Sequence, residues 1–227
     1  MKNLILIAVS LIICKIAQAQ EIYISNEGQS SAGSHAVGSD SWLATGFSTG
    51  SNVGGYFLNS VSLEMVNASG HPNGFAAMVY SAAGTANFSP GSKISGLTGS
   101  TNPLTSGIYD YSPVPNLFLL PNTAYFIVLT SETSLASGAY ESSYAGSFSY
   151  ILAGGWQAPL GTFAVDNYQS SNGSTWNYLG GPTQFSITAL PIPESSASWL
   201  LLLGGGICIY VRKRDHRSAC ARVEIWE

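Results

Sequence analysis

Residues 124–130 read Ala-Tyr-Phe-Ile-Val-Leu-Thr, a nearly continuous apolar run. It directly follows Pro121-Asn122-Thr123, a triplet of turn-forming residue types. Aromatic and β-branched side chains favour pleated strands. A short apolar run that does not alternate with polar residues is typical of a strand that is covered on both faces. The sequence therefore predicts a central, doubly buried β-strand at residues 124–130.

Further strand-like segments recur on both sides of this run, with turn signals between them. The Gly-rich stretch 50–55 predicts a turn, residues 67–74 predict a loop, and a polar loop is expected up to Ser92. The expected strands are residues 22–24, 41–47, 56–66, 75–80, 94–97, 108–111, 117–120, 140–144, 148–152, 163–168, 176–179 and 184–190. Many short strands without a helical period predict an all-β fold, an antiparallel β-sandwich of jelly-roll-like form.

The N-terminus has the pattern of an export signal. Lys2 supplies positive charge, residues 4–13 are apolar apart from one serine, and Ala17 and Ala19 form a small-x-small cleavage pattern. The apolar run is shorter than the ~20 residues that a transmembrane helix needs. Cys14 follows an isoleucine and not the small residue that a lipoprotein signal requires. We expect residues 1–19 to be a signal peptide that is cleaved after Ala19.

A second apolar run lies near the C-terminus, at residues 199–211, and the basic cluster Arg212, Lys213 and Arg214 follows it. The run is also short for a membrane span, and three glycines in its middle weaken a helix. Clustered cations stay on the cytoplasmic side, which would place residues 20–190 outside the inner membrane. The side chains expected in the short membrane helix are Trp199, Leu200, Leu201, Leu202, Leu203, Ile207, Ile209 and Val211.

The C-terminal segment contains three elements in a fixed order: Pro193 and Glu194, the apolar run, and the basic cluster. In this order and composition, residues 191–214 resemble the PEP-CTERM sorting domain. Ser195 stands where the family has a second proline, and an atypical tail, residues 215–227, continues beyond the basic cluster. The resemblance implies a membrane-embedded exosortase as partner, which would cleave near Pro193 and Glu194 and pass the protein to the cell surface. The alternative is a plain single-pass anchor.

Composition limits what residues 20–190 can bind. Lys93 is their only cation against eight carboxylates, which gives a formal net charge of −7. This charge argues against nucleic acid as a partner, and also against adhesion to anionic lipid surfaces. The segment contains no cysteine, because Cys14, Cys208 and Cys220 all lie outside it. An exported domain without disulfides must be stabilised by its own core, and thiol catalysis is excluded.

Three further stretches carry a second resemblance. Residues 38–50, residues 55–61 and the strand run with its turn, residues 121–129, are similar to the choice-of-anchor R domain. The similarity covers most of residues 25–190 and consists of glycine and aromatic positions, with no catalytic signature. It implies a surface β-domain whose ligand is unassigned, so the resemblance bears on fold and location.

The polar residues give no catalytic pattern. His35 and His71 lie in Gly/Ser/Asn-rich segments where we expect solvated loops, and a triad of His35 with Asp40 and a serine lacks the Gly-x-Ser-x-Gly context. A calcium ion bound between Asp110 and Asp166 is a further candidate, but no Asp-x-Asp-x-Asp spacing supports it. The scattered acids also show no glycosidase motif. We expect no enzyme, no cofactor and no metal.

Aromatic side chains are the better candidates for a binding site. Exposed tryptophan rings can stack on pyranose rings, so Trp42, Trp156 and Trp176 are the candidate glycan contacts, with four tyrosines beside them: Tyr140, Tyr144, Tyr168 and Tyr178. The competing interpretation is that these large rings fill the core of the sandwich. The sequence hypothesis is thus an exported structural or interaction protein of the envelope or matrix, in contact with exopolysaccharide; a carbohydrate-binding module is the alternative.

Overall fold

A computed structural model describes residues 20–84, 88–158 and 166–193 of the chain. These residues form β-strands, turns and loops, with no helix among them. The strands are β1 (Glu21–Ser25), β2 (Ser31–Val37), β3 (Trp42–Ser48), β4 (Tyr56–Gly70), β5 (Ala76–Ala83), β6 (Ser89–Thr98), β7 (Gly107–Pro113), β8 (Leu117–Leu119), β9 (Ala124–Thr130), β10 (Gly138–Ala145), β11 (Ile151–Leu152), β12 (Asn167–Ser170), β13 (Asn177–Tyr178) and β14 (Phe185–Pro191).

All pairings between these strands are antiparallel. Eleven strands join in the order β11-β1-β14-β4-β7-β6-β5-β9-β3-β12-β13; outside this order, β8 and β10 pair with β4, and β2 pairs with β10. Two short pairs, Leu97↔Pro113 and Thr98↔Ser112, make the link between β6 and β7. We call the strands β11 to β7 on one side of this link, together with β8 and β10, the β4 half, and the strands β6 to β13 on the other side the β9 half. The prediction of an all-β, antiparallel fold is confirmed.

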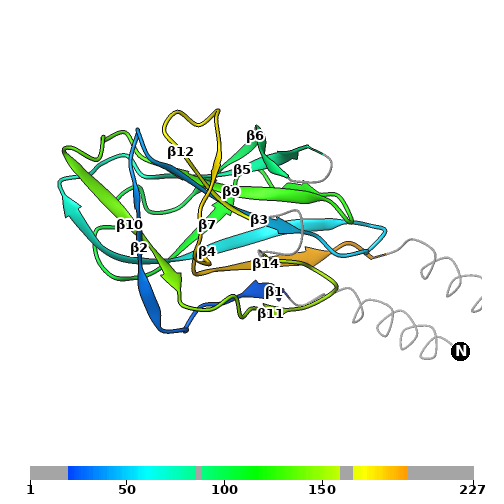
Figure 1. Cartoon of the computed structure of the whole chain (residues 1–227). Coiled ribbons are helices and arrows are strands. Elements are labelled where there is room, and N and C mark those ends of the chain that lie inside the picture. The colour runs from blue at the N-terminus through cyan, green and yellow to red at the C-terminus, as the bar shows by residue number, and fades with distance from the viewer. Residues whose placement is uncertain (1–19, 85–87, 159–165, 194–227) are drawn as a thin grey trace, which may run out of the picture. The chain divides into compact units, whose positions relative to one another are not determined.

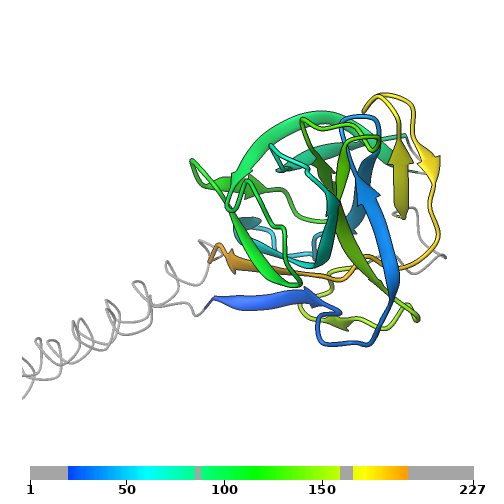
Figure 2. The same cartoon turned by 90° about the vertical axis from the view of Figure 1, so that its left-hand side faces the viewer.

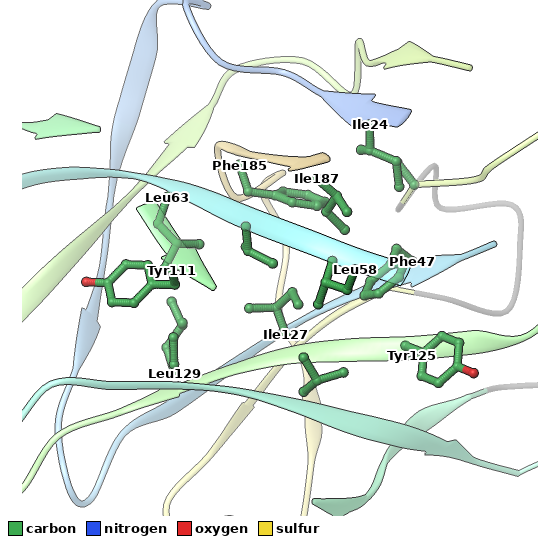
Figure 3. Close-up of a cluster of buried hydrophobic side chains, with 14 of the residues drawn as sticks. Ile24, Phe47, Leu58, Leu63, Tyr111, Tyr125, Ile127, Leu129, Phe185 and Ile187 are labelled. Carbon is green, nitrogen blue, oxygen red and sulfur yellow. The ribbon is translucent and has the colours of Figure 1, made fainter. Parts of the chain in front are cut away.

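The sheet curls so that the inner faces of its two halves enclose one core. Figures 1 and 2 show β9 and β5 lying across from β4 and β14. Leu58 and Leu63 of β4 and Ile187 of β14 belong to the same buried cluster as Phe47 of β3 and Ile127 of β9 (Figure 3). The two halves therefore stabilise each other by removing apolar surface from water.

The strand β9 lies where the sequence predicts it and is covered on both faces. Tyr125, Ile127 and Leu129 point into the shared core, while Phe126 and Val128 are buried on the opposite side. It has β5 and β3 as hydrogen-bonded neighbours, with registers such as Val79↔Ile127 and Thr45↔Ile127. The doubly buried central strand is confirmed.

Several element bounds differ from the prediction because a distant strand supplies the hydrogen-bonding partner. The segment 31–37 is a strand, β2, paired with β10, although its Gly and Ser content gave no strand signal. The expected loop at residues 67–74 is shorter, since β4 continues to Gly70 opposite Gly138. The expected polar loop before Ser92 also ends early, as β6 begins at Ser89. Residues 163–165 of a predicted strand lie outside the described residues.

Candidate functional site

The three candidate tryptophans lie in two different environments. Trp156 is 2% exposed and belongs to the shared core, whereas Trp42 and Trp176 are partly buried against a second apolar cluster. In Trp156 the indole is stacked on Tyr23 at 4.8 Å and on Phe47 at 5.8 Å between ring centroids. The hypothesis of an exposed sugar-stacking ring is therefore wrong for Trp156, and the core interpretation holds there.

The second cluster lies on the outer face of the β9 half, and we call it the aromatic face. Side chains alternate along a strand, so Leu43 and Phe47 of β3 point into the core while Trp42 and Ala44 point outward. The same alternation brings the outward residues of β5 and β9 beside them. The buried members of the face are Ala44, Met78, Tyr80, Phe126 and Val128, and Trp42, Ala82, Phe88, Tyr168 and Trp176 pack against them, partly exposed.

Trp42 is held in one position by its neighbours. Its indole N–H donates a hydrogen bond to the carbonyl oxygen of Ser39 at 3.0 Å. Gly173, with a φ of +70°, lies against the six-membered ring so closely that an added Cβ would meet ring carbons at 3.0–3.1 Å. A ring that is fixed before a ligand arrives loses little conformational entropy on binding.

Tyr168 packs on the strands beneath the aromatic face. It pairs with Ala44 in the β12–β3 ladder, and its ring makes an edge-on contact with Phe126 at 5.8 Å. Burial, and secondarily the charge of Asp166, raises the pKa of the Tyr168 hydroxyl, so it stays a neutral donor. The face thus combines flat apolar rings with an uncharged hydroxyl.

One uncharged loop borders the aromatic face, whereas the amide of β12 does not. Gln169 of β12 pairs with the core-facing Leu43 and so points away from the aromatic face; its side-chain amide donates to the hydroxyl of Ser41 at 3.0 Å. In the loop after β12, the side-chain oxygen of Asn172 accepts the backbone N–H groups of Ser174 and Thr175 at 2.9 and 3.0 Å. Stacking rings bordered by an uncharged polar loop are a combination that can orient a small polar ligand.

The four candidate tyrosines separate in the same way. Tyr140 is fully buried in the shared core, so it does not stack on a ligand. Tyr144 is stacked on His35 at 4.5 Å with 19° between the ring planes. Tyr178 of β13 is 61% exposed and pairs with Tyr168 across the β12–β13 ladder. Tyr168 and Tyr178 are thus the two that accompany the aromatic face.

The histidines and Asp40 show no shared arrangement. His35 is on strand β2 and not in a loop, which corrects the prediction; burial lowers the pKa of its imidazole, against a smaller rise from a Gly180 backbone contact and from Glu141. Asp40 instead accepts the backbone N–H of Leu135 at 2.9 Å. His71 is exposed in a loop, as expected.

The acidic candidates lie on different halves of the sheet. Asp110 of β7 accepts the hydroxyl of Ser62 at 2.6 Å, on the outer face of the β4 half. Asp166 immediately precedes β12 of the β9 half, and burial raises the pKa of its carboxyl. In the part of the chain that the structure describes, no three His, Cys, Asp or Glu side chains come together as a metal site.

The residues predicted for export and sorting lie mostly outside the described residues. Ala17 and Ala19 fall in residues 1–19, while Glu194, the apolar run and the basic cluster fall in residues 194–227; Pro193 is described and exposed. The chain divides into two units by contacts, Met1–Pro191 and Ile192–Glu227. Within residues 20–84, 88–158 and 166–193, no helix has the length and hydropathy of a membrane span.

The fold and the aromatic face define an all-β protein with an apolar outer face on one half of its sheet. Comparisons with protein-family models, with curated proteins and with solved structures give no significant match. Sequence reasoning missed Phe88 and the outward members of β5 as part of this face. Residues 124–130 did indicate that such a face exists, because a strand that is apolar on both sides requires apolar side chains to cover its outer side.

Proposed function

We propose that this chain is an exported, surface-directed protein whose β-domain serves as a structural or interaction module of the cell envelope or extracellular matrix. In this proposal, residues 1–19 are a signal peptide and residues 191–214 are a PEP-CTERM-like sorting signal that an exosortase reads in the inner membrane. The domain in between is a jelly-roll-like β-sandwich without enzymatic activity or cofactor. The observation that carries the proposal is the order of Pro193 and Glu194, the apolar run and the basic cluster.

Sorting is tested by substitutions in the signal. In a host that has an exosortase, Glu194→Ala should keep the full-length protein in the inner membrane. Ser195→Pro, which completes the prolyl-glutamyl-prolyl element, should increase the fraction that is released. Glu132→Ala, on an exposed loop of the β-domain, is the control. Unchanged release of Glu194→Ala would favour the plain single-pass anchor.

The second candidate function is carbohydrate binding, and the gathering of Trp42 and Trp176 on one face favours it. Because residues 20–190 carry a net charge of −7, the ligand would be an uncharged polysaccharide and not an acidic one. Trp42→Ala and Trp176→Ala should each weaken binding to neutral glycans about tenfold, which corresponds to about 1.4 kcal/mol.

The control for glycan binding is Phe118→Ala, which removes an exposed aromatic ring from the β4 half. It should leave the dissociation constant unchanged in the same glycan-array and pull-down measurements. Equal losses in the control and in the tryptophan variants would mean that binding reflects general stickiness of aromatic side chains. If the parent protein binds no glycan, carbohydrate binding is contradicted and only the structural role remains as the proposal.

A further inference from the structure

Several loops and both ends of the β-domain lie at one end of the sheet, which we call the exit end. β1 begins there opposite the last residues of β14, with the register Glu21↔Ala189 (Figure 2). The loops that follow β3 and β8 lie there as well, since Ser48 pairs with Ala124 and the N–H of Asn122 donates to the carbonyl oxygen of Gly50. The chain leaves the β-domain at this end.

Five large apolar side chains are exposed at the exit end, and we call them the exit rim. They are between 38% and 76% exposed and come from two strands, two loops and the short strand β8: Ile22, Val53, Phe57, Phe118 and Leu120. Scattered single apolar residues are normal on a protein surface. These five side chains instead lie together at one end of the domain. A group of exposed apolar side chains indicates a surface that contacts another apolar partner.

The exit rim is a built surface. The rings of Phe57 and Phe118 make an edge-on contact at 5.9 Å across the β4–β8 pair. The backbone of Leu120 is held from two sides: its N–H donates to the Tyr125 hydroxyl at 2.9 Å, and its carbonyl oxygen accepts the Thr49 hydroxyl at 2.6 Å. The rim therefore presents its side chains without further folding.

Polarity rises with distance from the exit end along the outer face of the β4 half. Phe57 is at the exit end, Ser60 and Thr188 follow with a contact of 2.7 Å between their hydroxyls, and Glu64 comes last. Glu64 lies seven positions after Phe57 along the strand, a distance of about 23 Å. Among residues 20–84, 88–158 and 166–193, Glu21 is the acid beside the rim, and its side chain interacts with the hydroxyl of Tyr23. The other carboxylates on this outer face, Glu64 and Asp110, lie farther from the exit rim.

We infer that the exit rim rests on the lipid bilayer while the C-terminal segment holds the chain in the membrane. This inference rests on the proposed membrane attachment. Seven residues lie between Pro191 and Trp199, the start of the apolar run, and the eight steps of chain from one to the other span at most about 28 Å, so the exit end stays near the bilayer. The surface fits zwitterionic lipid, because Lys93 is the only lysine or arginine in residues 20–193 and no basic cluster is available for anionic headgroups.

The test uses the full chain in a cysteine-free background, reconstituted into phosphatidylcholine vesicles. An environment-sensitive fluorophore is attached to Leu120→Cys on the rim or to Leu104→Cys at the opposite end, two leucines of similar exposure. Phosphatidylcholine with a nitroxide near the headgroup end of its acyl chain serves as quencher. Quenching should be several-fold stronger at position 120 than at position 104.

Flotation of the vesicles tests membrane attachment separately from the contact of the exit rim with the bilayer. If the protein floats with the vesicles but both positions are quenched equally, the rim contact is overturned while membrane attachment stands. If the protein does not float, the proposed attachment fails and the rim contact fails with it. Formation of a disulfide between two copies of unlabelled Leu120→Cys, without quenching of the labelled protein, would place a second copy on the rim and would also overturn the inference.

Discussion

The two halves of the sheet share one core but have very different outer faces. On the β4 half, away from the exit rim, the outward residues include paired hydroxyls and carboxylates, such as Ser62, which donates to Asp110 at 2.6 Å. On the β9 half, Phe126 and Val128 are fully buried on the outer side as well. An antiparallel sheet commonly keeps one face in water, as the β4 half does. The β9 half departs from that rule, and its apolar outer face requires a cover.

The chain supplies this cover with large rings that are themselves only partly buried. Trp42 comes from β3, Tyr168 from β12, and Phe88 and Trp176 from loops beside the sheet. A cover made of such rings stabilises the strand beneath and leaves flat aromatic surface facing outward. The same side chains can therefore serve stability and ligand binding, and experiments on the two outer faces separate the two roles.

The largest effect is expected from Phe126→Ala on the outer side of β9. The side chain is 0% exposed, and loss of a buried phenylalanine leaves a cavity, so the free energy of unfolding should fall by about 3–5 kcal/mol. Thr188→Ala on the outer face of the β4 half removes a hydrogen-bonded hydroxyl and one half-buried methyl group and should cost about 1 kcal/mol. Urea unfolding followed by tryptophan fluorescence measures both. Equal, small costs would mean that the two outer faces do not differ in burial.

The sequence predicts the strands whose side chains carry their own signal. The run at β9 and the alternation at β14 required no knowledge of a partner. β2, with the sequence Ser-Ala-Gly-Ser-His-Ala-Val, has little intrinsic strand preference and forms because β10 offers it a ladder, with pairs such as Ser142↔His35. Pairings of this kind are set by long-range topology and are not written in the local sequence.

The candidate site was predictable to a similar extent. The sequence selects Trp42, Trp156 and Trp176 equally, because all three are large rings in a strand-rich domain. For Trp42 the alternation with Leu43 and Phe47 indicates the outward face once the core face is known. Trp156 follows a turn at Gly154 and has no such pattern, so only the fold reveals that its ring is stacked on Tyr23 in the core.

A medium effect is expected from Gly173→Ala, which tests how firmly Trp42 is held on the aromatic face. The substitution places a Cβ within 3.0–3.1 Å of the indole and adds the strain of a positive φ, about 1–2 kcal/mol. Glycan affinity should fall because the ring must shift. Gly28→Ala is the matched control, since Gly28 has a similar φ of +78° but open space around it.

Thermal unfolding and glycan binding of the two glycine variants separate backbone strain from ring displacement. Both variants should lose stability, but only Gly173→Ala should lose affinity for a neutral polysaccharide. If Gly28→Ala weakens binding as much, the loss follows from general destabilisation, and the position of Trp42 does not matter for the ligand. If neither variant changes binding, the aromatic face acts only as a cover for β9.

The smallest effect is expected at Glu27, on the polar outer face. Burial raises the pKa of its carboxyl above the ordinary value, and the charges of Asp110 and Glu64 add to this rise. A hydrogen bond from Ser186 acts in the opposite direction. A carboxyl whose pKa is raised on folding destabilises the fold once it is ionised, so this penalty is absent below about pH 4 and grows as the pH rises through the folded-state pKa. Glu27→Gln should therefore raise the melting temperature at pH 7 by about 1–2 °C and leave it unchanged at pH 3.5. Ser186→Ala, which removes the hydrogen bond that favours the ionised form, should lower it at pH 7. If Glu27→Gln is less stable than the parent at pH 7, the ionised carboxylate stabilises this face and the prediction is wrong. The two outer faces would then differ only in how many apolar side chains cover them.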